Sequence, residues 1–375
     1  MIKNKKIKIY GDGIHDDTCA LQAMLDKRGL VEVPEGKYLI TKPLIIHDDT
    51  HLKLTSTTVL RLADGANCAI LDNDGLYNNT VNRNITIEGG IWDGNNIHQK
   101  REFVADQHQP CDYNKYVSNS LLVLMIRLVH TERLTVKNIV LKDPTTYGIH
   151  IADVKYYTVE NVFLDYNLKT LNMDGVHIQG PARFGSIRNV YGNGNDDQVA
   201  ICTNGTTRSE CTRGDIEDLV IDGVFSDNGY TGVRLLSCGD TLRNVTVKNV
   251  YGEFRVFGVS LTHCYPVRED MPILFENVHI TNVHASKSRA DLTGLAHGII
   301  KDSIIWFEES VNCKNVLIEN VYRHERNLET KAPTIQIDKN VTAENLKFRN
   351  IVNIFDGEEL EMIQNNSDCE YTLEK

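Results

Sequence analysis

Two short segments of the chain carry three aspartates at a spacing that could support acid–base chemistry. Asp174 directly precedes the apolar run 175–178, and Asp196 with Asp197 directly precedes a similar run, 198–201. If both runs are strands of neighbouring repeats, Asp174 and Asp197 occupy one position in adjacent repeats, about 4.8 Å apart. Clustered carboxylates do not all ionise easily, so one can stay a protonated acid beside an ionised base. Glycoside hydrolysis needs such a pair.

A simpler interpretation is that these aspartates are turn residues, a common role for Asp and Asn. Asp174-Gly175 and Asn195-Asp196 each fit a turn by themselves. We favour chemistry because two carboxylate sites fall at the same position of a repeat, beside a row of polar residues.

The elements that must position the aspartates form that repeat. From residue 83, alternating segments such as ITIEGGI, LTVKNIV and VTVKNVY recur, mostly 23 to 34 residues apart. Alternation with period two is typical of strands, and Asn or Gly at the turn tolerates the left-handed backbone of a sharp bend. Strand repeats of this length without helices predict an all-β fold, a single-stranded parallel β-helix. The turn marker is Gly89, Asn138, Asn161, Asn189, Gly223, Asn249, Asn277, Asn320 and Asn350.

A second strand in each coil places one side chain outward between two inward aliphatic residues. These outward residues are His150, His177, Ala200, Arg234, Ser260, Trp306 and Gln336. A row with His, Arg, Trp and Gln resembles a saccharide platform, although an ordinary solvated face is the alternative. Long polar segments at 93–117, 203–216, 262–272 and 284–302 are candidate walls of the same cleft.

The chain divides into three predicted parts. Residues 1–55 form an N-terminal cap and first coil, in which Ala20, Leu21, Met24 and Leu25 share one face of a short helix. Residues 56–356 form the β-helix, which we expect to be the catalytic domain. Residues 357–375 form a C-terminal cap or tail.

Composition excludes some roles. The net charge of -11 argues against nucleic acid or an anionic membrane as partner. No run approaches the roughly 20 apolar residues of a membrane span, and the N-terminus shows no secretory signal. The nine cysteines are scattered without a CxxC, so we expect reduced thiols, no metal or cofactor site, and a cytoplasmic protein. Oligomeric state stays open.

Three motifs carry a family resemblance. Asn172-Met173-Asp174-Gly175 resembles the NTDG motif of polygalacturonase-like glycoside hydrolases, 195–201 (NDDQVAI) resembles their GDDCVAI motif, and 90–95 (GIWDGN) their early GxIDGxG turn. The likeness covers roughly residues 85–355, and residues 10–55 resemble the cap of pectate-lyase-like β-helices. It implies a right-handed parallel β-helix in which Asp174, Asp196 and Asp197 hydrolyse a polysaccharide, such as a pectic one, with inversion. Asn172 then belongs to the substrate site, with His150, His177, Arg234, Trp306 and Gln336.

The chain departs from the family where GHG and then RIK should follow. Gly232-Val233-Arg234-Leu235-Leu236 is similar to GVRIK with leucine for lysine, whereas counting coils puts Tyr230-Thr231-Gly232 at GHG without its histidine. In the family the Arg/Lys pair faces a substrate carboxylate, so a galacturonate at the cleavage point is in question. Two alternatives to hydrolysis stay open: a lyase or epimerase of uronate sugars, and a non-catalytic, tailspike-like carbohydrate-binding β-helix.

Overall fold

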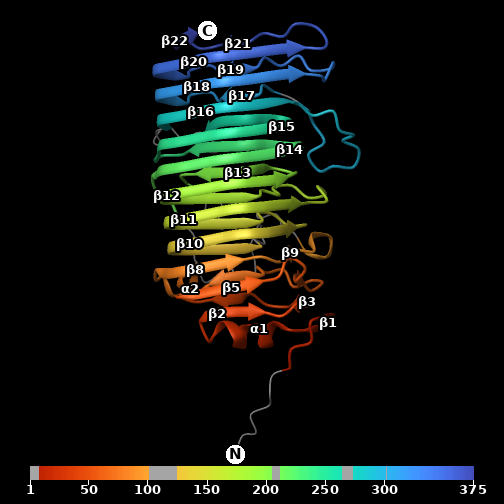
Figure 1. The fold of residues 1–375 in the computed structure, drawn as a ribbon. Helices are drawn as coiled ribbons and strands as arrows, with labels where there is room; N and C mark the ends of the chain where they lie inside the picture. The colour runs from red at the N-terminus through yellow and green to blue at the C-terminus, as the bar shows by residue number, and fades with distance from the viewer. Residues whose placement is uncertain (1–7, 101–124, 205–211, 264–272, 301) are drawn as a thin grey trace, which may run out of the picture.

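The protein is a right-handed parallel β-helix, an elongated stack of coils with the chain ends at opposite ends (Figure 1). The computed structural model describes residues 8–100, 125–204, 212–263, 273–300 and 302–375. The named strands pair in parallel throughout, each with a strand of the neighbouring coil. The predicted all-β fold is therefore confirmed.

The N-terminal end of the stack is closed by the predicted helix. This helix, α1, buries Ala20, Leu21 and Leu25, and it lies across the end of the stack below β2 (Figure 1). The elements here are β1 (Asp12–Asp16), α1 (Thr18–Leu25), β2 (Gly29–Val33), β3 (Lys37–Ile40), β4 (Leu44–Ile46), β5 (Thr50–Leu54), β6 (Val59–Leu62), β7 (Leu71–Asn73), α2 (Asp74–Asn78), β8 (Asn82–Glu88), β9 (Ile91–Asp93) and η1 (Asn96–His98).

Strands of 3 to 23 residues form the rest of the stack, and several of the long ones bend from one face of the coil to the next. They are β10 (Ile126–Lys142), β11 (Ile149–Asp165), β12 (Val176–Gly192), β13 (Asp197–Cys202), β14 (Ile216–Ser237), β15 (Thr241–His263), β16 (Leu274–Lys287), β17 (Ile305–Phe307), β18 (Asn312–Glu325), β19 (Ile335–Ile337), β20 (Thr342–Phe355), β21 (Ile363–Asn365) and β22 (Tyr371–Glu374). The final pair, β21 and β22, continues the stack by pairing with β19 and β20. The domain boundaries at 55 and 356 stay a prediction.

The core is a set of aliphatic columns, one side chain from each coil. One column runs through coils from β12 to β19, and each of its members is fully buried: Ile178, Ile201, Leu235, Leu261, Phe307 and Ile337. Burying such a side chain contributes about 1.5–3 kcal/mol. Because inward and outward positions alternate, this column fixes which side chains face outward beside it.

The bends occur twice per coil, five residues apart, and the predicted marker mixes the two series. Asn249 aligns with Asn282, because Lys248 pairs with Thr281, whereas Asn277 aligns with Asn244. Asn282 and Asn277 both have a left-handed backbone, with φ of 58° and 55°. The assignment of Asn277 to the Asn249 series was wrong. Two Asn positions five residues apart within one segment satisfied the same pattern.

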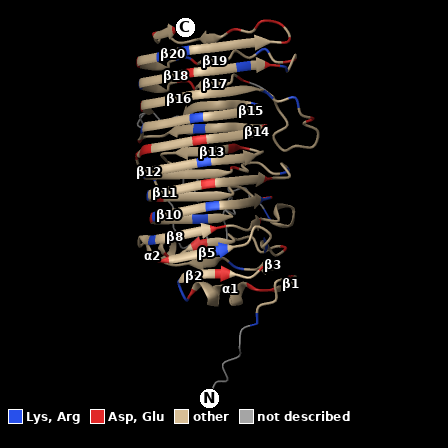
Figure 2. Cartoon of the chain, in the orientation of Figure 1, with Lys and Arg blue, Asp and Glu red and all other residues tan. Residues whose placement is uncertain are grey.

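The outer faces carry charges of both signs (Figure 2). One outward column alternates in sign from coil to coil: Glu88, Lys137, Glu160, Arg188, Asp222 and Lys248. The Lys248 ammonium lies 3.1 Å from Asp222. Opposite charges on neighbouring strands favour this register over a slipped one. No helix in the described ranges has the length and apolar character of a membrane span.

Candidate active site

The three aspartates lie at the start of two adjacent coils. Val176 of β12 pairs with Val199 of β13, and the Gly175 amide donates to the Asp197 carbonyl at 2.9 Å. This register places Asp174 and Asp197 at the same position in neighbouring coils. Asp196, one residue earlier, is the more exposed of the pair, at 15% against 6% for the Asp197 side chain.

Each carboxylate has a different set of partners. His177 Nδ1 lies 2.9 Å from an oxygen of Asp174, and both side chains are nearly buried. Asn172 donates its side-chain amide to Asp196 at 3.3 Å. Arg234 is 3.9 Å from Asp197, beyond a direct hydrogen bond. The aspartates therefore sit among basic and amide groups that can orient them separately.

Burial is the main influence on the acid pair Asp196 and Asp197. It raises the pKa of Asp196, which Arg234 and then His297 lower in part. It raises the pKa of Asp197 well above the usual range, and the neighbouring Asp196 raises that pKa further, against the opposing effect of Arg234. The pair titrates as a unit and holds a proton above the pH at which an exposed carboxyl loses it.

The predicted outward row exists as one continuous column, but its two halves differ in exposure. Register pairs join His150, His177, Ala200, Arg234, Ser260, Trp306 and Gln336 in that order. His150 and Ser260 are fully buried, and Ala200 and His177 are 3% and 5% exposed, whereas Arg234, Trp306 and Gln336 are half-buried. The accessible part of the column therefore lies on the C-terminal side of the aspartates.

His150 has an unusual environment. Burial, then the neighbouring His177 and Arg127, lower the pKa of its imidazole well below the usual value, so the ring is neutral. Neither ring nitrogen hydrogen-bonds to any described residue. Tyr147 stacks on the neighbouring His177 ring at 4.3 Å, which leaves His150 behind this pair. Because it is buried, His150 does not lie on the exposed saccharide platform that the sequence predicted.

Trp306 and Gln336 form a second polar and aromatic group on the column. The Trp306 ring stacks on Phe257 at 4.5 Å, and its indole nitrogen donates to Asp338 at 2.9 Å. Gln336 donates its amide to the other oxygen of Asp338 at 2.7 Å. Two bonds to one carboxylate fix both side chains, so the site is pre-organised.

The register decides between the two motif alignments. Arg234 pairs with Ala200, so it lies in the coil directly after Asp197, and Thr231 pairs with Asp197 itself. Thr231 therefore occupies the position where the family has the GHG histidine. The next coil, where RIK would fall, places Ser260 beside Arg234 and Thr262 beside Leu236. Both the family's histidine and its Arg/Lys pair are absent from their expected positions.

Three further residues complete the site and were missed by sequence reasoning. His297 Nε2 lies 4.0 Å from Asp196, and its ring packs against Tyr230 with centroids 4.6 Å apart. The fully buried Arg255 lies behind Tyr230, 5.5 Å from the ring centroid. His297 comes from the aperiodic segment 284–302, which gave no positional signal beyond its description as a cleft wall. The other predicted walls, 93–117, 203–216 and 262–272, lie partly outside the described residues.

Nothing in the described ranges groups three His, Cys, Asp or Glu side chains for metal binding. The cysteines differ from expectation, because Cys238 is disulfide-bonded. The thiols of Cys19, Cys68, Cys313 and Cys369 are free. The prediction of uniformly reduced thiols is wrong for Cys238.

The comparisons with known proteins give one curated protein similar in sequence and several solved structures with the same fold. No family model matches the chain. The plasmin and fibronectin-binding protein A of Streptococcus pneumoniae is 26% identical over 395 aligned residues, which cover 90% of this chain. The chain spans about half the length of that relative, 52%.

Two solved structures share the fold. The surface adhesin PfbA of Streptococcus pneumoniae matches with a TM-score of 0.59 at 17% identity, over 98% of this chain and 90% of that one. The family 28 exopolygalacturonase of Yersinia enterocolitica matches with a TM-score of 0.53 at 13% identity, over 98% of this chain and 77% of that one. The same β-helix therefore occurs in an adhesin and in a polygalacturonase.

The expected cytoplasmic location is wrong. The chain is similar over most of its length to a protein whose solved structure is that of a surface adhesin. The disulfide at Cys238 agrees with this correction, since disulfides persist in oxidising compartments outside the cytosol. Scattered cysteines without a motif did not reveal that one of them is paired.

Proposed function

We propose that this chain is a glycoside hydrolase, a divergent relative of the polygalacturonase-like enzymes, and that Asp174, Asp196 and Asp197 cleave a glycosidic bond. The observation that carries the proposal is the meeting of three carboxyls at one level of the stack, where burial raises the pKa of both Asp196 and Asp197. A turn needs no such burial, because turn aspartates are ordinarily solvated.

The proposed reaction uses one proton donor and one proton acceptor. The Asp196/Asp197 pair donates its proton to the leaving oxygen as the bond from the anomeric carbon to that oxygen breaks. Water then attacks the anomeric carbon and gives its proton to Asp174, whose orientation His177 fixes. We expect inversion, as the resemblance implies, which requires roughly 6.5–9.5 Å between acid and base to admit that water. The strand spacing of about 4.8 Å between Asp174 and Asp197 would by itself favour retention, so Asp196 is the candidate acid and the configuration of the fresh product decides.

The substrate extends along the column toward the C-terminus. Arg234, Trp306 and Gln336 occupy this direction, and Ala200 and Trp306 are three coils apart, about 14 Å at 4.8 Å per strand. A sugar chain lying along the stack reaches from the aspartates to Trp306. His177 and Asn172 support the carboxylates of Asp174 and Asp196, whereas the buried His150 hydrogen-bonds to neither.

A panel of neutral and uronic oligosaccharides tests the proposal. Hydrolysis releases reducing ends without unsaturated products, and the fresh product has the anomeric configuration opposite to that of the bond cleaved. Unsaturated products identify a lyase instead, and an altered uronate with no cleavage identifies an epimerase. A lyase or epimerase must neutralise a uronate carboxylate, for which Arg234 is the nearest candidate on the column.

The second candidate function is adhesion through a protein partner. It rests on the 26% identity over 90% of this chain to a protein named for binding plasmin and fibronectin. Immobilised fibronectin and plasmin test it directly by surface plasmon resonance. Binding that Asp197→Asn leaves unchanged, with no release of reducing ends by the wild type from any glycan, favours adhesion over hydrolysis.

A further inference from the structure

We propose that the segment 288–300 supplies a second imidazole to this site, beside His177, and that His297 acts through Asp196 as a positioning residue. The inference rests on the proposed function for its catalytic consequence, and on geometry alone for the coupling between the two side chains. The strand that follows Asp197 in the stack carries Thr231 and not a histidine at the aligned position, and the strand histidine His177 contacts Asp174. His297 approaches the pair from the side, on a separate element.

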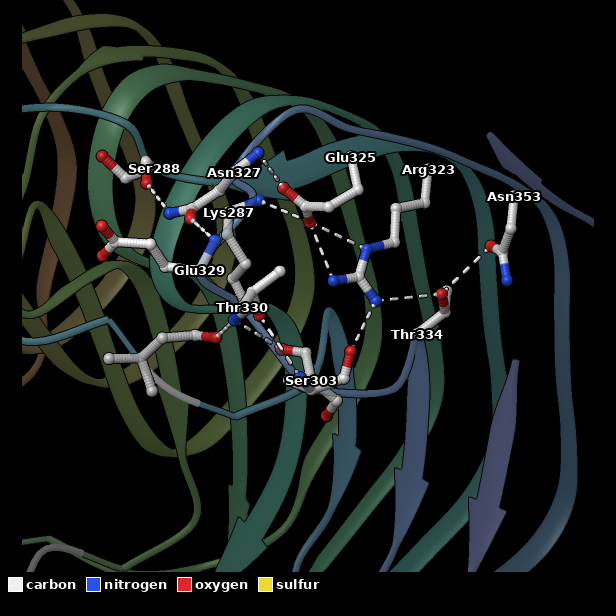
Figure 3. A network of polar contacts seen from close by, with 12 residues as sticks. Lys287, Ser288, Ser303, Arg323, Glu325, Asn327, Glu329, Thr330, Thr334 and Asn353 are labelled. Carbon is white, nitrogen blue, oxygen red and sulfur yellow. Dashed lines mark hydrogen bonds and ion pairs between the residues drawn. The ribbon is translucent and has the colours of Figure 1, made fainter. Parts of the chain in front are cut away.

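The base of the loop is fixed by a buried polar network (Figure 3). Lys287, fully buried, donates its ammonium to the carbonyl of Ser303 at 3.0 Å, which ties the two ends of the loop together. Glu325 accepts from the Lys287 amide at 3.2 Å and from the buried Arg323 guanidinium at 2.8 Å. Asn327 holds the Ser288 carbonyl at 2.6 Å. Buried charge-assisted bonds of this kind are costly to break, so the loop starts and ends at defined points.

Two hydrogen bonds hold the loop next to the His297 side chain, one at the Ala296 amide and one at the His297 carbonyl. The Ala296 amide donates to the Leu168 carbonyl at 3.1 Å. The Arg255 guanidinium donates to the His297 carbonyl at 2.6 Å and to the Gly194 carbonyl at 3.0 Å. Gly194 lies two residues before Asp196, so one buried cation joins the loop to the aspartate turn. This arrangement sets the imidazole and the carboxylate relative to each other.

The distance between the His297 imidazole and the Asp196 carboxylate favours a charge–charge interaction over a direct hydrogen bond. At 4.0 Å, Nε2 of His297 is beyond a hydrogen bond to Asp196 but within the range at which an opposite charge stabilises a carboxylate. The imidazole is 25% exposed, so it can take a proton from solvent. The groups that face this pair from the surrounding elements are Asp197, His177, Arg234, Tyr230 and Arg255.

Histidine-selective NMR tests the coupling without a substrate. The imidazole titration of His297, assigned by its loss in His297→Gln, is followed in the wild type and in Asp196→Asn. We expect the midpoint to fall in Asp196→Asn, since the variant removes a carboxylate that favours the charged ring. The matched control Asp338→Asn, at the Trp306 end of the column, leaves it unchanged. Equal midpoints in the wild type and Asp196→Asn overturn the inference.

Kinetics on a glycan that the wild type cleaves test the catalytic consequence of removing the His297 imidazole. His297→Gln removes a group that lowers the pKa of Asp196, so the limb of the pH–rate profile set by the acid pair moves to higher pH. We expect kcat to fall at least about 10-fold with little change in KM, as for a lost acid–base partner. The control His324→Gln changes an exposed histidine paired with Asp356 and keeps the profile. An unshifted profile in an active His297→Gln overturns the role, whereas a wild type without hydrolytic activity overturns only the proposed function.

Discussion

Asp197→Asn is predicted to stabilise the protein while it removes activity. The Asp197 side chain is 6% exposed, and its 3.9 Å distance from Arg234 is too long for a direct bond. Its pKa is raised well above the usual range, first by burial and then by Asp196. Between the unfolded pKa of about 3.9 and the higher folded value, the folded protein binds more protons than the unfolded chain. The free energy of unfolding therefore falls as the pH rises through that window.

Asparagine keeps the shape of the side chain and removes this pH-dependent cost. A gain of about 1–2 kcal/mol is typical when a functional residue that opposes folding is neutralised. The entropy of unfolding is about 2.1 cal/mol/K per residue, or about 0.8 kcal/mol/K for the 375 residues. Dividing the gain by this entropy gives a rise in Tm of about 1–3 °C at pH 7.

Differential scanning calorimetry of the wild type and Asp197→Asn from pH 4 to pH 8 measures this difference. We expect the gap in Tm to be widest at the upper end and to close toward pH 4. The matched control is Asp218→Asn, because hydrogen bonds from Asn244 and Arg183 lower the pKa of Asp218, so its ionised form is stabilising. That variant leaves Tm unchanged or lowers it. A Tm that is lower in Asp197→Asn than in the wild type at pH 7 refutes the reasoning, because it shows that the ionised Asp197 carboxylate stabilises the fold.

Three other outcomes follow from the geometry. Asn282 lies at a left-handed bend and donates its side-chain amide to Tyr251, so Asn282→Ala lowers the free energy of unfolding by about 1–2 kcal/mol, and Asn282→Gly lowers it less because glycine accepts that backbone. Equal losses for the two variants in urea titrations contradict this. Trp306→Ala raises the KM or Kd for a long glycan about 10-fold at unchanged kcat, and an unchanged value for both long and short glycans places the sugar elsewhere. Reducing the disulfide at Cys238 costs about 2–4 kcal/mol, and a Tm insensitive to reductant shows that this bond does not stabilise the fold.

The sequence alone predicted the fold, and the level at which the candidate aspartates align, for a physical reason. A parallel β-helix is fixed by period-two alternation and by repeated bends, and both are local properties of the chain. The same alternation placed Arg234 and Trp306 on one column, and it aligned Asp174 with Asp197. The confusion of Asn277 with Asn282 shows the limit of the method, because neighbouring bends five residues apart use the same residue types.

What the sequence could not predict depends on long-range packing. His297 reaches Asp196 from a segment without periodicity, 101 residues further along the chain. Its position depends on the buried side chains of Arg255 and Lys287, whose partners are backbone carbonyls and therefore leave no pattern in the sequence. The burial of His150 and the pairing of Cys238 are likewise set by what packs over them.

The most direct test of the central claim compares single Asn variants of Asp174, Asp196 and Asp197 with the wild type on a glycan that the wild type cleaves. Release of reducing ends is measured at substrate saturation, with Asp218→Asn as a variant outside the site. The account predicts that each of the three variants loses 10²–10⁴-fold or more in kcat, roughly the loss of a catalytic acid or base, while Asp218→Asn stays near wild type. Activity within a few-fold of the wild type in all three variants would contradict it and make the aspartates structural.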